Sequence, residues 1–221
     1  MAEIDRVREA YAHCQALVRA HDKDHFIAAL FAPADRRPYL FALYAFALEI
    51  ARVKSLVREP MAGMIRLQWW REAISGLRAS EAAASPVMIA LQDAAQRTGV
   101  SLAPLTAAVE ARQAELSGPP TADAAAAVFK MGARFLGGEG EAVDAAAALA
   151  ARAEALVETD PEEARKVYTA LRAELDGLPK HVLSAFLPVA LVPLRLKRPG
   201  APQWRRQLVL LRTSWFGFPK V

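Results

Sequence analysis

Six basic side chains in the N-terminal third are the first candidates for chemistry, because they could hold a phosphate. They are Arg36, Arg37, Arg52, Lys54, Arg66 and Arg71. A guanidinium presents a planar fork of donors that matches phosphate oxygens, so this set is a candidate site for a phosphate or a lipid headgroup. The alternative is that these residues form solvated helix faces or pair with Glu49, Glu59 and Glu72. We favour the second interpretation.

A second cluster has the residue types of a metal site. It consists of His21, Asp22, Asp24 and His25, and its histidines are four residues apart. The segment breaks between two predicted helices, however, and aspartates in such a break are typical of helix N-caps. We therefore predict caps here and no metal site.

The segment from residue 195 onward mixes basic and aromatic side chains and contains no acidic residue. This mixture suits the headgroup layer of an anionic membrane, where each basic residue contributes about 1 kcal/mol. The candidate membrane-surface residues are Arg195, Lys197, Arg198, Trp204, Arg205, Arg206 and Trp215. The alternatives are a solvated helix whose tryptophans dock on the core, and base stacking on RNA. Because no nucleic-acid motif is recognisable, we predict no nucleic-acid partner.

Helices must position these groups, because apolar residues recur at helical spacing along most of the chain. We expect helices near residues 4–20, 25–31, 35–55, 64–76, 85–97, 102–116, 121–136, 141–157, 161–175, 180–194 and 203–212. The third is apolar nearly all round, which is typical of the centre of a bundle. In it and the next helix, Tyr44, Phe46 and Trp70 are candidates for lining a cavity. No strand-like alternation is long enough to predict a sheet.

Composition agrees with a helical protein. The 221 residues are 54% hydrophobic, and much of this fraction is alanine, the best helix former. The length suffices for a single helical domain over residues 1–221. The apolar runs are shorter than the roughly 20 residues of a membrane span, and no secretory signal is visible, so we expect a cytoplasmic protein. The single cysteine, Cys14, excludes an internal disulfide.

Several motifs carry a resemblance to a known family. Residues 24–46 read DHFIAALFAPADRRPYLFALYAF, and residues 63–72 read GMIRLQWWRE. Together they resemble the N-terminal third of squalene/phytoene synthases, in particular the branch that includes a mitochondrial complex I assembly factor. Residues 185–193 resemble the C-terminal helix of that branch. The resemblance implies an all-α, isoprenoid-synthase-like helical bundle, shortened in the middle relative to the catalytic members.

The resemblance also implies which residues would do the chemistry, and they are missing. Catalytic members carry an Asp-x-x-x-Asp motif whose carboxylates hold Mg²⁺ against the substrate diphosphate. Aligned on the Tyr-Ala-Phe element, the two aspartate positions fall on Ala51 and Ser55, and a preceding arginine position falls on Leu48. Arg52 and Lys54 on the same turn would repel a cation. A second aspartate-rich motif is also absent, so we expect no catalytic residue, no metal and no cofactor.

These observations lead to one functional hypothesis and one alternative. The hypothesis is a pseudoenzyme of squalene/phytoene synthase type that acts as an assembly-type factor, peripheral at the inner face of the membrane. Its expected partners are an isoprenoid or other lipid, an anionic membrane surface and a protein. The alternative is an active prenyltransferase that condenses isoprenoid diphosphates with Mg²⁺. Acidic side chains facing one another across a cavity, such as Glu49 with Asp123 or Asp144, would favour that alternative.

Overall fold

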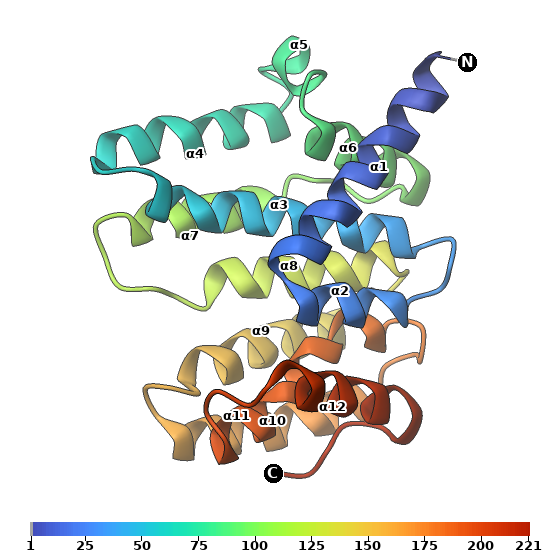
Figure 1. The fold of residues 1–221 in the computed structure, drawn as a ribbon, viewed down its shortest axis with the longest axis vertical. Helices are drawn as coiled ribbons and strands as arrows, with labels where there is room; N and C mark the ends of the chain where they lie inside the picture. The colour runs from blue at the N-terminus through green and yellow to red at the C-terminus, as the bar shows by residue number, and fades with distance from the viewer. Residues whose placement is uncertain (1) are drawn as a thin grey trace.

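The alanine-rich and amphipathic segments form helices along residues 2–221, the part of the chain that the computed structural model describes (Figure 1). The helices are α1 (Ala2–His21), α2 (Lys23–Leu30), α3 (Arg37–Leu56), α4 (Pro60–Ile74), α5 (Ala79–Ala82), α6 (Pro86–Thr98), α7 (Leu105–Glu115), α8 (Asp123–Phe135), α9 (Glu141–Leu156), α10 (Pro161–Asp176), η1 (Leu183–Ala185), η2 (Leu187–Leu191), α11 (Val192–Lys197) and α12 (Gln203–Phe216). Over this range no strand occurs, and the predicted all-α class is confirmed.

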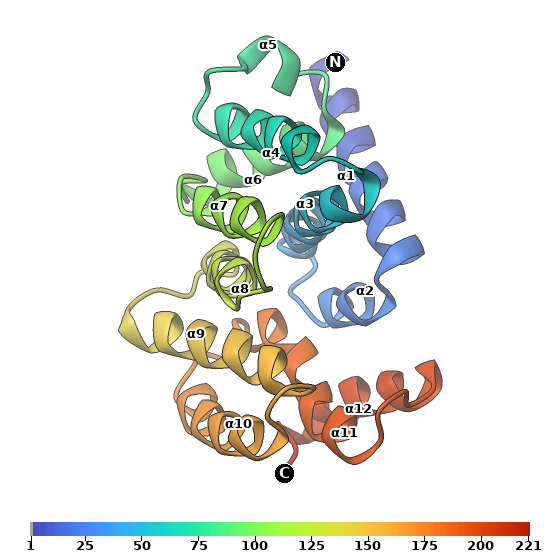
Figure 2. The same cartoon turned by 90° about the vertical axis from the view of Figure 1, so that its left-hand side faces the viewer.

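The helices are stacked in layers between the two ends of the chain (Figures 1 and 2). α4 and α6 lie toward the N-terminal end, α3 and α7 follow, and α10 to α12 lie at the C-terminal end. α1 crosses the first layers and packs on α3 and α6. α8 contacts α3 and α7 on one side and α9 on the other, so it joins the N-terminal layers to the α9–α10 pair.

The central helix is α3, as its uninterrupted apolar pattern predicts. Seven consecutive residues, Leu40 to Phe46, are buried. Contacts with α1, α4, α6, α7 and α8 surround the helix, which explains why it has so little polar face. Phe46 is fully buried and meets Trp70 edge to face, with ring centroids 5.2 Å apart.

Asp22 and Asp160 cap the starts of α2 and α10, whereas Asp24, also predicted as a cap, lies inside the first turn of α2. The Asp22 carboxylate accepts a hydrogen bond from the backbone N–H of His25 at 3.0 Å. The Asp160 carboxylate accepts one from the N–H of Glu163 at 3.1 Å, and Pro161 occupies the first helical position. Each cap satisfies a donor that the helix cannot pair itself.

The prediction of one continuous helix over residues 180–194 is wrong. The chain forms two short 3₁₀ segments, η1 and η2, and then begins α11 at Val192. Pro188 and Pro193 account for the difference, because proline has no N–H to donate and its ring obstructs the preceding turn. The tighter 3₁₀ turns accommodate this sequence in short pieces.

The alanine-rich middle forms closely packed helices. α8 and α9 lie against each other, and α9 packs along α10. A Cβ placed on Gly132 of α8 would lie 3.3 Å from the Ala185 Cβ, so glycine permits the close approach of η1. Within the described residues, none of the helices combines the length and the apolar character that crossing a membrane requires.

Candidate functional site

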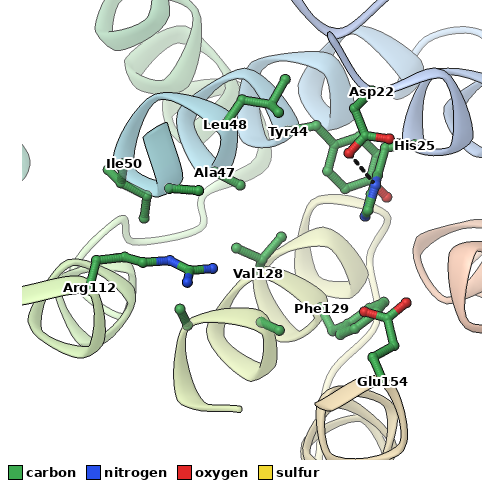
Figure 3. Close-up of a pocket in the computed structure, with 13 residues that line it drawn as sticks. Asp22, His25, Tyr44, Ala47, Leu48, Ile50, Arg112, Val128, Phe129 and Glu154 are labelled. Carbon is green, nitrogen blue, oxygen red and sulfur yellow. Dashed lines mark hydrogen bonds and ion pairs between the residues drawn. The ribbon is translucent and has the colours of Figure 1, made fainter. Parts of the chain in front are cut away.

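A partly open cavity of about 220 Å³ lies between α3 and α8, with polar side chains at two ends (Figure 3). Its walls are mainly apolar and include Leu48 and Ile50 of α3 and Val128 and Phe129 of α8. One end carries Arg112 of α7, and the other carries Asp22, His25, Tyr44 and Glu154 (Figure 3). The cavity is therefore a largely apolar pocket with polar groups at two ends.

The polar end is built around a histidine and an aspartate from the α1–α2 junction. His25 Nδ1 lies 2.8 Å from Asp22 Oδ2, because Asp22 caps α2 and holds its carboxylate over the first turn. Burial lowers the pKa of His25, but the hydrogen bond and charge of Asp22 outweigh burial and leave that pKa above its ordinary value. Burial raises the pKa of Asp22, but His25 brings it below its ordinary value.

Tyr44 and Glu154 complete this end from α3 and α9. Tyr44 is 4% exposed, and its ring meets the His25 ring edge to face at 4.6 Å. Burial raises the pKa of Tyr44, and the charges of Asp22 and Glu154 add to this effect. Burial also raises the pKa of Glu154, which Arg195 and His25 oppose in part. The Tyr44 hydroxyl has no hydrogen-bond partner among the described residues.

The other end is a guanidinium whose charge is already compensated. Arg112 Nη1 donates to the Glu115 carboxylate, which is nearly buried and also accepts from the N–H of Thr121 at 3.0 Å. Lys54 donates to the backbone carbonyl of Glu115. Glu115 therefore ties α7 to the segment that leads into α8, and it fixes Arg112 at the cavity wall.

The pairing of His25 with Asp22 predicts a pH dependence of stability. Because the folded pKa of His25 is above 6.5, its contribution is complete below pH 6.5 and is lost as the pH rises through the raised pKa. Because the folded pKa of Asp22 is below 3.8, its contribution is present above pH 3.8 and is lost as the pH falls through the lowered pKa. The variant H25Q is expected to lose the alkaline part of this dependence.

Urea denaturation from about pH 5 to pH 9 measures this effect, because His titrates in that range. The control is H181Q, since His181 is exposed on the surface and is expected to leave the slope unchanged. A wild-type slope in H25Q contradicts the assignment to His25.

The six candidate phosphate-binding residues do not converge on one site. Arg36 donates to the Phe135 carbonyl at 3.3 Å, and Arg37 donates to the Ala32 carbonyl at 3.4 Å. Lys54 contacts Glu115, as described above, and Arg71 pairs with the exposed Glu110 at 3.6 Å. Only the remaining two, Arg52 and Arg66, line a common groove.

That groove is lined by residues of α3 and α4 and is separate from the cavity. Glu49, Trp69 and Trp70 line it together with the two arginines. Of the three candidate cavity residues, Tyr44 lies on the cavity wall, Trp70 lies on this groove, and Phe46 is enclosed in the core. Asp144 pairs with Lys130, and neither it nor Asp123 lines the cavity or the groove.

The basic and aromatic C-terminal residues lie on α11 and α12. Leu210 of α12 is fully buried against Leu187 and Leu191 of η2, so this face docks the helix on the bundle. Trp204 and Trp215 are 59% and 73% exposed. Arg205 stacks on Trp204 with its guanidinium carbon 5.0 Å from the ring centroid, whereas Arg206 pairs with Asp24 at 3.4 Å.

Sequence comparison supports the resemblance to a known family. The sequence profile described as Squalene/phytoene synthase matches residues 18–127, from the end of α1 into α8. Across these residues, just under half of its length, the chain is similar to the squalene/phytoene synthase family. The predicted resemblance is therefore confirmed. Of the cavity's polar groups, only Glu154 lies beyond the matched residues, which include Asp22, His25, Tyr44 and Arg112.

The chain is also similar to named relatives. It is 32% identical over 104 residues to "NADH dehydrogenase (ubiquinone) complex I, assembly factor 6" of Homo sapiens, which is 47% of this chain and 31% of that protein. Identity to the Bos taurus protein of the same name is 30%, with the same coverage. The Drosophila melanogaster homolog is 33% identical over 73 residues, 33% of this chain and 22% of that protein. The chain thus matches about a third or less of the length of these relatives. No solved structure matches it significantly.

Within this family, the positions that would carry Mg²⁺ ligands do not fit a divalent cation. Ala51 lies on the cavity wall and offers only a methyl group. Ser55 is exposed, and its hydroxyl donates to the Arg52 carbonyl at 2.8 Å. Of the cavity carboxylates, Asp22 is occupied as a cap facing His25. In the described residues, no three His, Cys, Asp or Glu side chains are grouped so that they could hold a metal ion.

Two cavity residues, Arg112 and Glu154, were not among the sequence candidates, although helical spacing contains a signal for both. Glu154 follows Ala147 and Ala150 of α9 by seven and four residues, and both alanines are buried. Arg112 follows Leu105 and Val109 of α7 at the corresponding spacings of seven and three. Charged residues that continue the buried face of a helix must find a partner or a cavity.

Proposed function

We propose that this protein is a catalytically inactive member of the squalene/phytoene synthase family that works as an assembly-type factor at an anionic membrane surface. The relatives named complex I assembly factor 6 support the assembly-type role. In this proposal the protein is cytoplasmic, peripheral at the inner face of the membrane, has no metal cofactor, and acts on a protein partner in the assembly of an NADH dehydrogenase. α12 is the element that contacts the membrane.

The observation that carries the membrane contact is an apolar row on the outer face of α12. Trp204, Leu208, Leu211 and Trp215 follow one another at intervals of four, three and four residues, so they lie on one helical face. All four are exposed, and Phe216 beside them is 80% exposed. A helix that docks through Leu210 and presents a second apolar face outward suits the boundary of headgroups and acyl chains.

The basic residues of α11 and α12 favour an anionic membrane over an uncharged apolar partner. Arg205 stacks on Trp204, Arg212 is exposed, and Lys197 and Arg198 lie on the surface at the end of α11. No acidic residue follows residue 195. Cations beside exposed tryptophans are attracted to anionic lipids and hold the aromatic rings at the headgroup layer.

Vesicle binding tests this contact. Co-sedimentation with vesicles of phosphatidylcholine and about 30% phosphatidylglycerol is expected to be strong at low salt and to weaken as salt rises. The double variant W204A/W215A is expected to bind at least about tenfold more weakly, because burying each ring is worth more than about 1 kcal/mol. The matched control I65A/L77A removes two exposed apolar residues at the other end of the molecule and is expected to bind normally.

The role in assembly and the lack of activity need their own measurements. Cells without the protein are expected to contain less assembled NADH dehydrogenase on native gels, and I65A/L77A is expected to restore it while W204A/W215A does not. Equal vesicle binding by both variants contradicts the membrane contact. Condensation of farnesyl diphosphate by the purified protein with Mg²⁺ contradicts catalytic inactivity and supports the prenyltransferase alternative.

A further inference from the structure

The α3–α8 cavity carries an inference that is independent of α12. Its most informative residue is Tyr44, which is 4% exposed and places a hydroxyl without a partner at the cavity's polar end. A buried hydroxyl left unpaired costs about 1–3 kcal/mol, so a hydrogen-bonding group in the cavity would recover this energy. The cavity is also large enough for more than a water molecule.

Two of the charged groups at the cavity ends are already paired. His25 faces Asp22 at 2.8 Å, and Arg112 donates to Glu115. Burial raises the pKa of Glu154, which favours its uncharged form. A charged group placed in this cavity would lose its hydration, which is unfavourable in a largely apolar site.

The shape and the walls define the rest of the ligand. Between its polar ends the cavity is bounded by Leu48, Ile50, Val128 and Phe129 (Figure 3). These side chains offer dispersion contacts to a hydrocarbon but no hydrogen bonds. A hydroxyl is a suitable head, because it can accept from Tyr44 and also donate to a carboxylate such as Glu154, which lies at the same end.

We infer that this cavity binds an uncharged, elongated apolar molecule with a terminal hydroxyl group, which hydrogen-bonds to the Tyr44 hydroxyl and extends its hydrocarbon part between α3 and α8. The site needs no metal ion and no diphosphate. It therefore differs in ligand chemistry from the substrate site that the family's aspartates would build. Asp22 holds His25 in place beside the same head group.

Three ligands that share an eight-carbon hydrocarbon chain but carry different head groups test the inference. The full chain is titrated by calorimetry with 1-octanol, octanoate and octylammonium, without vesicles or added metal. Octanol is expected to bind at least about tenfold more tightly than either ion, because each ion must lose its hydration in a largely apolar site. Tighter or equal binding of octanoate points to Arg112 as an anion site, tighter or equal binding of octylammonium points to Glu154, and either result overturns the inference.

Two variants and a matched control locate the binding. Y44F is expected to weaken octanol binding about tenfold through loss of the hydrogen bond. The control Y168F removes another buried tyrosine hydroxyl that has no partner among the described residues, on α10 and outside the cavity, and it is expected to leave binding unchanged. The A51F side chain is expected to occupy the cavity and abolish binding. Because Ala51 is exposed, α3 is expected to stay folded.

Equal affinities in Y44F and Y168F, or normal binding by A51F, overturn the site. So does a lack of octanol binding at millimolar concentration. W204A/W215A is expected to bind octanol normally, so failure of the cavity inference and failure of the membrane proposal are distinguishable.

Discussion

Replacing Phe46 with alanine is expected to lower the free energy of unfolding by about 3–5 kcal/mol. Phe46 is fully buried in the central helix, and the edge-to-face contact with Trp70 contributes beyond the buried area. Neighbouring helices contact α3 on several sides, so they can collapse only in part into the space that the ring leaves. In a domain of this size the loss corresponds to a midpoint about 6–20 °C lower.

Chemical denaturation followed by circular dichroism measures this loss, and the same substitution elsewhere provides the control. Phe216 is 80% exposed, so F216A is expected to change stability by no more than about 0.5 kcal/mol. If F46A and F216A have the same midpoint, α3 is not the centre of the cooperative core. Because Phe46 lies two residues from Tyr44, F46A is also expected to disturb octanol binding indirectly.

The central position of α3 could be predicted because the relevant signal is local. A helix whose apolar residues cover its whole circumference can be stable only when other elements surround it. The caps at Asp22 and Asp160 were predictable for the same reason, since they depend on residues within one turn of the helix start. The family resemblance depended on contiguous motifs, and it was confirmed over the residues that contain most of them.

The polar end of the cavity could not be assembled in the same way. Asp22 was predicted correctly as a cap, but its position beside Glu154 depends on how α9 packs after more than a hundred intervening residues. The six candidate phosphate-binding residues lie close together in sequence but not in the structure. Arg36 and Arg71, for example, contact different parts of the bundle. Spacing along one helix predicts a shared face, whereas a site made by several helices depends on their packing.

The failure over residues 180–194 has a different cause. The apolar composition of this segment favoured a buried helix, and the segment is indeed buried around Leu187 and Leu191. Its two prolines remove backbone donors at positions where a continuous helix needs them. Burial of this segment was therefore predicted correctly. Its backbone conformation was not, because the prediction relied on the apolar composition and did not take the positions of the prolines into account.

Replacing Asp24 with alanine is expected to lower the free energy of unfolding by about 2–3 kcal/mol. Asp24 is nearly buried, accepts a hydrogen bond from Gln203 at 3.1 Å and pairs with Arg206 at 3.4 Å, so it links α2 to the first turn of α12. Removing one partner of a buried pair costs about 3–5 kcal/mol, and the partial exposure of Arg206 reduces this value. The control D35A removes a carboxylate that is 77% exposed and is expected to cost at most about 0.5 kcal/mol.

Local opening of α12 in D24A would show whether Asp24 stabilises only this helix or the whole bundle. The remaining buried contacts of α12, around Leu210, lie further along the helix, so its first turn should open more easily in D24A than the core does. Hydrogen exchange is expected to accelerate at Arg206 and Gln207 more than in α3, and D24N, which keeps an acceptor for Gln203 but loses the charge, should fall between D24A and the wild type. If exchange accelerates equally in α3 and α12, Asp24 stabilises the whole bundle, and the exposed row of α12 is held in place by its apolar contacts alone.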